Sequence, residues 1–126
     1  MIQFGSAWGP VLVWMMVIFI FSAQSHPPFV PGGSGFPYFI RKAGHFTEYA
    51  ILASLCRRAV GARRGAWLIA LVLASVYAVS DEWHQSWVPG RDALVGDWLI
   101  DSVGAAVGLF MATQGRKIIR VPERAQ

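Results

Sequence analysis

Residues 67–79 read WLIALVLASVYAV, and none of these thirteen positions carries a charge. A surface helix of a soluble bundle shows a polar stripe along one face, and this stretch has none. Residues 10–21, PVLVWMMVIFIF, lack a polar face in the same way. A helix satisfies its backbone hydrogen bonds internally and is therefore stable in hydrocarbon. Both stretches predict helices that are embedded in a membrane.

The composition supports a membrane protein of one domain, residues 1–126. Hydrophobic residues make up 55% of the chain, above the roughly 45–50% that is usual for soluble domains. The chain of 126 residues is too short for a second domain of ordinary size. Its one cysteine, Cys56, lies in an apolar run and excludes an internal disulfide. The basic residues lack aromatic interleaving, so nucleic acid is not an expected partner.

The apolar runs predict an all-α bundle of four transmembrane helices. The expected spans are about residues 7–22, 42–57, 65–85 and 93–113, followed by a basic tail at 114–126. The connection 22–39 holds four prolines and three glycines, so we expect it to be irregular. No Lys or Arg precedes the first span, which favours a retained helix over a signal peptide. Cleavage, leaving three spans, is the alternative.

The basic residues predict the orientation. They gather between the second and third spans, at Arg57, Arg58, Arg63 and Arg64, and in the tail, at Arg116, Lys117, Arg120 and Arg124. With four spans these two regions lie on the same side of the membrane. Lys and Arg accumulate in short cytoplasmic loops. We therefore expect both termini to be cytoplasmic.

The acidic residues gather at the opposite side. The stretch 80–97, SDEWHQSWVPGRDALVGD, holds four carboxylates, a histidine and an arginine between apolar runs. With Glu48 and Asp101, six of the seven carboxylates of the chain belong to the predicted outward ends of the helices. The sequence therefore predicts a polar pocket at the extracytoplasmic face.

Helical spacing brings these polar residues onto shared faces, because residues three or four apart lie on one side of a helix. The residues so spaced are Lys42, His45 and Tyr49, with Glu48 beside them, in the second span, Asp81, His84 and Gln85 in the third, and Asp97 and Asp101 in the fourth. A carboxylate that faced lipid would cost several kilocalories per mole. We therefore expect the three faces to point at one another, with Asp101 one turn deeper than Asp97.

The segments FSAQS, KAGHFTEYAILA and YAVSDEWHQSWVPGRDALVGDWLIDSVGAAVG resemble the VanZ-like family of small bacterial membrane proteins. The pattern runs from about residue 21 to residue 108. The resemblance implies a multi-pass protein of the bacterial cytoplasmic membrane, in a family linked to resistance to the glycopeptide teicoplanin. The positions that match are Lys42, His45, Glu48, Tyr49, Asp81, Glu82, His84, Gln85, Arg91, Asp97 and Asp101.

One function that fits these residues is an enzyme acting on a lipid-linked or phospholipid substrate of the cell envelope. Histidine with nearby carboxylates supplies a general base and a general acid. His45 or His84 is the expected base, and Asp81 or Asp101 orients it or acts as the acid. The candidate catalytic residues are His45, Glu48, Asp81, Glu82, His84, Asp97 and Asp101; Lys42, Tyr49, Gln85 and Arg91 are candidates for substrate binding, with Lys42 and Arg91 suited to a phosphate.

Two other function classes remain open at this stage. The same residues would suit a lipid-binding or transport element without chemistry, or an internal polar network that fixes the bundle. The imidazoles and carboxylates are plausible metal ligands, but no HExxH motif is present and we predict no metal site. Membrane lipids are the expected partners. The sequence names neither a cofactor nor an oligomeric state.

Overall fold

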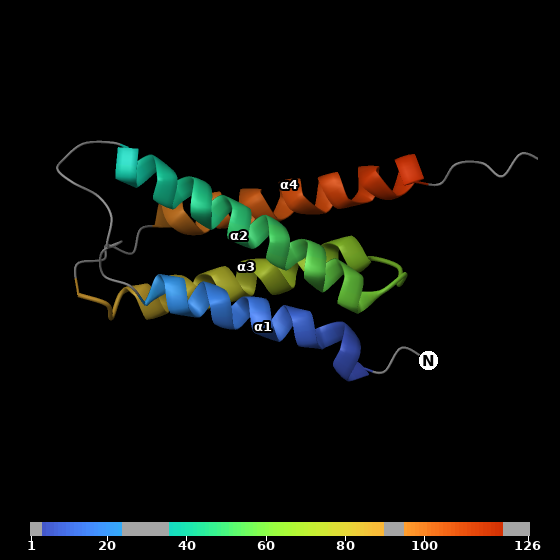
Figure 1. Ribbon diagram of the computed structural model, residues 1–126, viewed down its shortest axis with the longest axis horizontal. Coiled ribbons are helices and arrows are strands. Elements are labelled where there is room, and N and C mark those ends of the chain that lie inside the picture. The colour runs from blue at the N-terminus through green and yellow to red at the C-terminus, as the bar shows by residue number, and fades with distance from the viewer. Residues whose placement is uncertain (1–3, 24–35, 90–94, 120–126) are drawn as a thin grey trace, which may run out of the picture.

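A computed structural model describes residues 4–23, 36–89 and 95–119 of the chain. This part of the protein is all-helical, as predicted. Its helices are α1 (Phe4–Ser22), α2 (Phe36–Val60), α3 (Ala66–Gln85) and α4 (Val95–Ile119). They lie side by side as an elongated bundle in which α2 packs against each of the other three, most extensively against α4 (Figure 1).

Three helices are longer than the sequence pattern predicted, α2 and α4 by more than α1. We expected an irregular connection through residue 39, but α2 begins at Phe36. Pro37 is the second residue of the helix, and proline is tolerated in a first turn because the N–H groups there have no partner within the helix. At the other end of the chain, α4 runs to Ile119 and takes in the first residues of the predicted tail.

Three of the helices are long and apolar enough to cross a membrane. The qualifying segments are Gly5–Ser22 of α1, Ala66–Gln85 of α3 and Val95–Gly115 of α4. They expose large apolar side chains, such as Leu12 on α1, Val76 on α3 and Met111 on α4, as helices in contact with lipid do. The first half of α2 carries polar residues, and α2 is not among these three segments. Its predicted span, residues 42–57, therefore stays a prediction.

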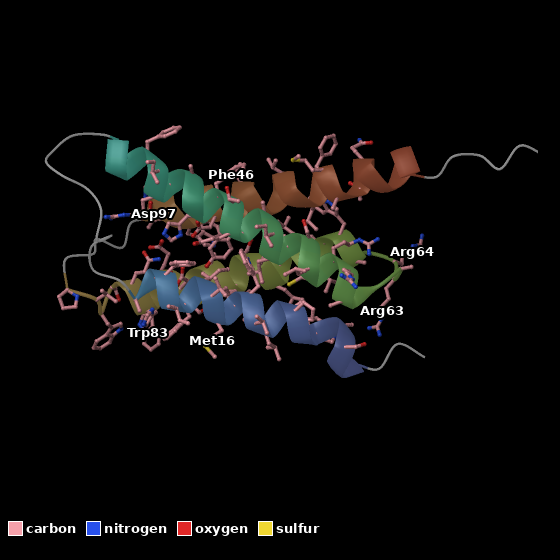
Figure 2. All side chains as sticks on the ribbon, viewed as in Figure 1. Met16, Phe46, Arg63, Arg64, Trp83 and Asp97 are labelled. Atoms are coloured by element: carbon pink, nitrogen blue, oxygen red, sulfur yellow. The ribbon has the colours of Figure 1, made fainter. Side chains whose placement is uncertain are left out.

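The two ends of the bundle differ in charge. The start of α1, the α2–α3 turn and the end of α4 lie together at one end (Figure 1). Figure 2 shows Arg63 and Arg64 at this end and Asp97 at the other. Gly61 and Gly65 bound the turn with φ of 79° and 76°, a left-handed conformation that glycine adopts without strain.

Close packing of α2 on α4 depends on two glycines one turn apart. A Cβ built at Gly104 would overlap the backbone of Phe46, and one at Gly108 would overlap the backbone of Ala50. Small residues let membrane helices approach until their backbones touch. The side chains that flank this contact toward the acidic end are those of the candidate site.

Polar bonds fasten α1 to the rest of the bundle. Trp14 donates its indole N–H to the carbonyl of Glu48 on α2 at 2.9 Å. Tyr77 on α3 donates its hydroxyl to the carbonyl of Met15 at 2.6 Å. A buried hydrogen bond in a membrane protein contributes about 0.6 kcal/mol on average. These bonds set the register of α1 against α2 and α3, and so bring the last residue of α1 to the polar site.

Candidate functional site

A cluster of buried polar side chains lies between the helices at the acidic end of the bundle. Its members are Ser22, His45, Asp81, Gln85, Asp97 and Asp101, together with the phenol of Tyr49. Along α3, the buried face consists of alanines at every fourth position, Ala66 to Ala78, and then of Asp81 and Gln85. The small residues bring the helices close together, and the polar residues continue the same face into the cluster.

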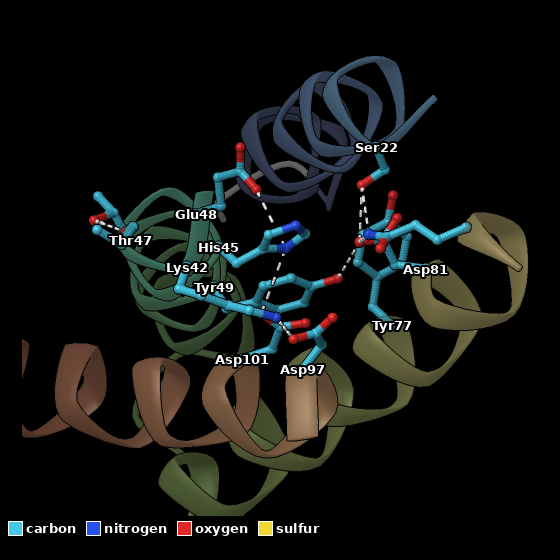
Figure 3. Close-up of polar contacts among 12 residues, drawn as sticks. Ser22, Lys42, His45, Thr47, Glu48, Tyr49, Tyr77, Asp81, Asp97 and Asp101 are labelled. Carbon is cyan, nitrogen blue, oxygen red and sulfur yellow. Dashed lines mark hydrogen bonds and ion pairs between the residues drawn. The ribbon is translucent and has the colours of Figure 1, made fainter. Parts of the chain in front are cut away.

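His45 lies between two carboxylates at the centre of the cluster (Figure 3). Its Nδ1 is 3.5 Å from Oδ1 of Asp101 and 3.9 Å from Oε2 of Glu48. Asp101 has an exposed fraction of 0%, and neither of its carboxylate oxygens has a hydrogen-bond partner among the described residues. Asp101 and His45 thus form a buried carboxylate–imidazole pair that joins α4 to α2.

Asp81 accepts hydrogen bonds from two neighbouring helices and from its own. Its Oδ2 accepts from the hydroxyl of Ser22 at 2.9 Å, from the hydroxyl of Tyr49 at 3.2 Å and from the amide of Gln85 at 3.2 Å. The Gln85 amide also donates to Ser22 at 3.3 Å. One carboxylate oxygen therefore links α1, α2 and α3.

Lys42 and Asp97 form an ion pair between α2 and α4, about one helical turn nearer the acidic end of the bundle than the His45–Asp101 pair. Both side chains are largely buried. The ammonium group of Lys42, which we expected to bind a substrate phosphate, is therefore paired with a carboxylate of the protein. Glu82 is half-buried. Arg91, the other expected phosphate ligand, lies outside the described residues.

His84 lies apart from the central cluster. Its ring stacks on Phe19 of α1, with 4.2 Å between the ring centroids and 26° between the planes. The sequence placed His84 on one face with Asp81 and Gln85, but only the latter two are buried in the cluster. The structure therefore does not join His84 to His45 and Asp101.

Three residues of the site were absent from the sequence-based candidates. Ser22 ends α1, as the predicted first span does, but its hydrogen bond to Asp81 was not expected. Phe19 was read as one of many apolar residues of that span. Helical spacing places Tyr77 one turn before Asp81 on the same face, but Tyr77 was not among the predicted site residues. Among the described residues, no group of three His, Cys, Asp or Glu side chains is placed to hold a metal ion.

The fold and the site define a class: a small all-helical protein with helices able to cross a membrane and a buried site of histidine and carboxylates. The sequence model of the VanZ/LLP1 family matches residues 7–119, so the chain belongs to that family. This confirms the resemblance drawn from the motifs. No curated protein and no solved structure matches the chain.

Proposed function

We propose that this protein is a membrane enzyme that acts on a lipid-linked or phospholipid substrate of the cell envelope, with His45 and Asp101 at the reacting centre. The observation that carries the proposal is the placement of His45 Nδ1 3.5 Å from the fully buried carboxylate of Asp101. A carboxylate beside one nitrogen of an imidazole stabilises the protonated ring. The other nitrogen is then the atom that exchanges a proton with a substrate.

A purely structural role explains Asp101 poorly. Taking a carboxylate out of water costs several kilocalories per mole, which is offset only when its lone pairs are satisfied. Asp101 faces one imidazole, and neither of its oxygens accepts a hydrogen bond from the described residues. Buried polar atoms without partners are uncommon in proteins and call for a functional explanation. A reactive pair that meets a substrate supplies one.

The remaining residues take supporting roles in this proposal. Glu48 is the second carboxylate beside His45 and helps to hold a positive charge on the ring. Lys42 would bind a substrate phosphate in competition with Asp97, its partner in the structure. Arg91 is proposed as the second phosphate ligand, because a guanidinium suits that group well.

The structural alternative has its strongest support at Asp81. This carboxylate is buried like Asp101, but it accepts three hydrogen bonds and ties three helices together. We therefore assign Asp81, Tyr49 and Gln85 to the framework of the site, and His45 and Asp101 to its chemistry. A lipid-binding or transport element without chemistry would use the same cluster and is separated from the enzyme by measuring turnover.

We propose a bacterial inner-membrane protein with both termini and the arginine-rich turn in the cytoplasm, so that the polar cluster lies near the outer leaflet. The arginines at one end of the bundle and the acids at the other support this orientation under the positive-inside rule. A substrate in the outer leaflet would fit a role in glycopeptide resistance, the phenotype that the family resemblance suggests.

Cysteine labelling tests the orientation. In a Cys56→Ser background, Ala62→Cys lies in the arginine-rich turn and Ser86→Cys in the turn after α3, and both positions are exposed. A membrane-impermeant thiol reagent added to intact cells is expected to label Ser86→Cys and not Ala62→Cys. Ala62→Cys should react once the membrane is permeabilised. The opposite pattern would place the polar cluster in the cytoplasm.

Turnover of envelope lipids tests the enzyme. We expect the purified protein in nanodiscs of bacterial lipid extract to alter one lipid class, followed by mass spectrometry. Asp101→Asn and His45→Gln should each lower the rate by about 10²–10⁴-fold, the contribution typical of acid–base groups. Thr47→Ala is the matched control, since Thr47 is exposed, donates its hydroxyl to the carbonyl of Ala43 and points away from the cluster (Figure 3). An unaltered lipid pool, or full activity in both site variants, would contradict the proposal.

A further inference from the structure

A pocket of about 450 Å³ lies beside the central cluster, where the end of α1 meets the end of α3. Its lining consists of Phe19, Tyr77, Ser80, Asp81, Trp83, His84 and Trp87. Four of these seven side chains are aromatic, and the stacked rings of Phe19 and His84 bring the α1 and α3 sides together. Pockets of about 300–1,000 Å³ are the usual size for small-molecule sites.

Two polar atoms of this lining are buried without a hydrogen-bond partner in the described part of the chain, Oδ1 of Asp81 and Nδ1 of His84. Asp81 is only 3% exposed, and all three of its hydrogen bonds reach Oδ2. Nδ1 of His84 is an acceptor when the ring carries its proton on Nε2. An unsatisfied buried acceptor costs about 1–3 kcal/mol, so these atoms indicate a ligand that donates hydrogen bonds.

The charge of the lining selects the kind of donor. Asp81 is its one acid, and none of its residues is Lys or Arg. A phosphate or carboxylate group would be repelled there. An ammonium group would be attracted both by Asp81 and by the faces of the aromatic rings, which bind ammonium ligands through cation–π interactions.

The position of the pocket indicates which kind of molecule carries the ammonium group. Trp83 and Trp87 are 69% and 73% exposed and make an edge-to-face pair with 6.1 Å between centroids. Tryptophans favour the membrane–water interface, where lipid headgroups lie. We propose that this pocket binds the ammonium headgroup of an amine-bearing phospholipid of the phosphatidylethanolamine type. The assignment of this lipid as the substrate rests on the function proposed above, whereas its binding does not.

Binding to the detergent-solubilised protein tests the proposal, with native mass spectrometry as the readout. The probes are phosphatidylethanolamine, phosphatidylglycerol with the same acyl chains, and free ethanolamine as a competitor. We expect phosphatidylethanolamine to bind about tenfold more tightly, the preference that a partly desolvated cation–π site gives. Equal affinity for the two lipids would overturn the proposal, and so would stronger binding of free ethanolamine than of the lipid.

A pair of tryptophan variants locates the site. Trp83→Leu keeps an apolar side chain in the lining but removes the ring face, and it should abolish the preference for phosphatidylethanolamine. Trp67→Leu makes the same exchange at an exposed position near the other end of α3 and should retain the preference. Trp83 is exposed, so its loss should leave the fold intact, which a melting curve checks. An unchanged preference in Trp83→Leu would place the lipid elsewhere and overturn the assignment.

The Asp101→Asn variant separates this inference from the proposed function. Asp101 is not part of the pocket lining, so the variant should keep the preference for phosphatidylethanolamine while losing turnover. Selective binding without turnover in the wild-type protein would support the lipid-binding pocket and contradict the proposed enzyme activity. Turnover of a lipid without an amine, together with no binding preference, would support the enzyme activity and contradict the proposed binding of an ammonium headgroup in the pocket.

Discussion

Gly108→Ala is expected to lower the free energy of unfolding by about 3 kcal/mol, the upper part of the range for overpacked sites. The added Cβ would lie 2.6 Å from the Cα of Ala50 and would also overlap the carbonyl of that residue. Both atoms belong to the backbone of α2, so no side-chain rotation relieves the clash. The helices must separate along the contact that also carries Gly104, and the Ser54 hydroxyl would lose its 3.3 Å bond to the Gly108 carbonyl.

Thermal melting in one detergent measures this effect, and Gly96→Ala is the control on the same helix. A Cβ at Gly96 meets nothing within 4 Å, and alanine favours a helix over glycine by roughly 1 kcal/mol. Gly96→Ala should therefore leave the melting temperature unchanged or raise it. Equal melting temperatures for Gly108→Ala and the wild-type protein would show that the α2–α4 contact is looser than the structure has it.

The sequence predicted the number of helices because two signals agreed along the chain. Uninterrupted apolar runs located α1 and α3, and the basic residues between the second and third predicted spans marked the turn that joins α2 to α3. The start of α2 was predicted too late because proline was taken to end regular structure wherever it occurs. Pro37 is compatible with a helix because it lies in the first turn.

Spacing on single helices predicted much of the polar cluster, but it could not predict contacts between helices. The i, i+4 relation of Asp97 and Asp101 placed both on the buried face of α4. It could not show that Lys42 pairs with the first and His45 with the second, since the pairing depends on how α2 and α4 are staggered. Ser22 was missed because a serine at the end of an apolar run has no spacing partner.

The hydrogen bonds of Asp81 are expected to contribute to stability, whereas the carboxylate of Asp101 is not. Asp81→Leu removes the acceptor of Ser22, Tyr49 and Gln85 and leaves their donors buried. The Gln85 amide keeps its bond to the Ser22 hydroxyl. At about 1–3 kcal/mol for each of the other two donors, the free energy of unfolding should fall by about 2–6 kcal/mol. Asp101→Asn has nearly the same volume as the wild-type residue and replaces a buried carboxyl group that accepts no hydrogen bond within the described residues. Its stability should stay within about 1 kcal/mol of the wild-type value or exceed it.

Asp81→Asn separates the loss of charge from the loss of the acceptor, because its amide oxygen can take the place of Oδ2. It should recover most of the stability that Asp81→Leu loses, in melting curves recorded for all three variants in the same detergent. If Asp101→Asn melted at as low a temperature as Asp81→Leu, Asp101 would be part of the framework. That result would contradict a catalytic role for the His45–Asp101 pair. If both aspartate-to-asparagine variants melt with the wild-type protein and only Asp101→Asn loses turnover at saturating lipid, one cluster contains a framework carboxylate and a reactive one. The difference between the two carboxylates then arises from their neighbours, because three groups donate hydrogen bonds to Asp81 and none among the described residues donates to Asp101.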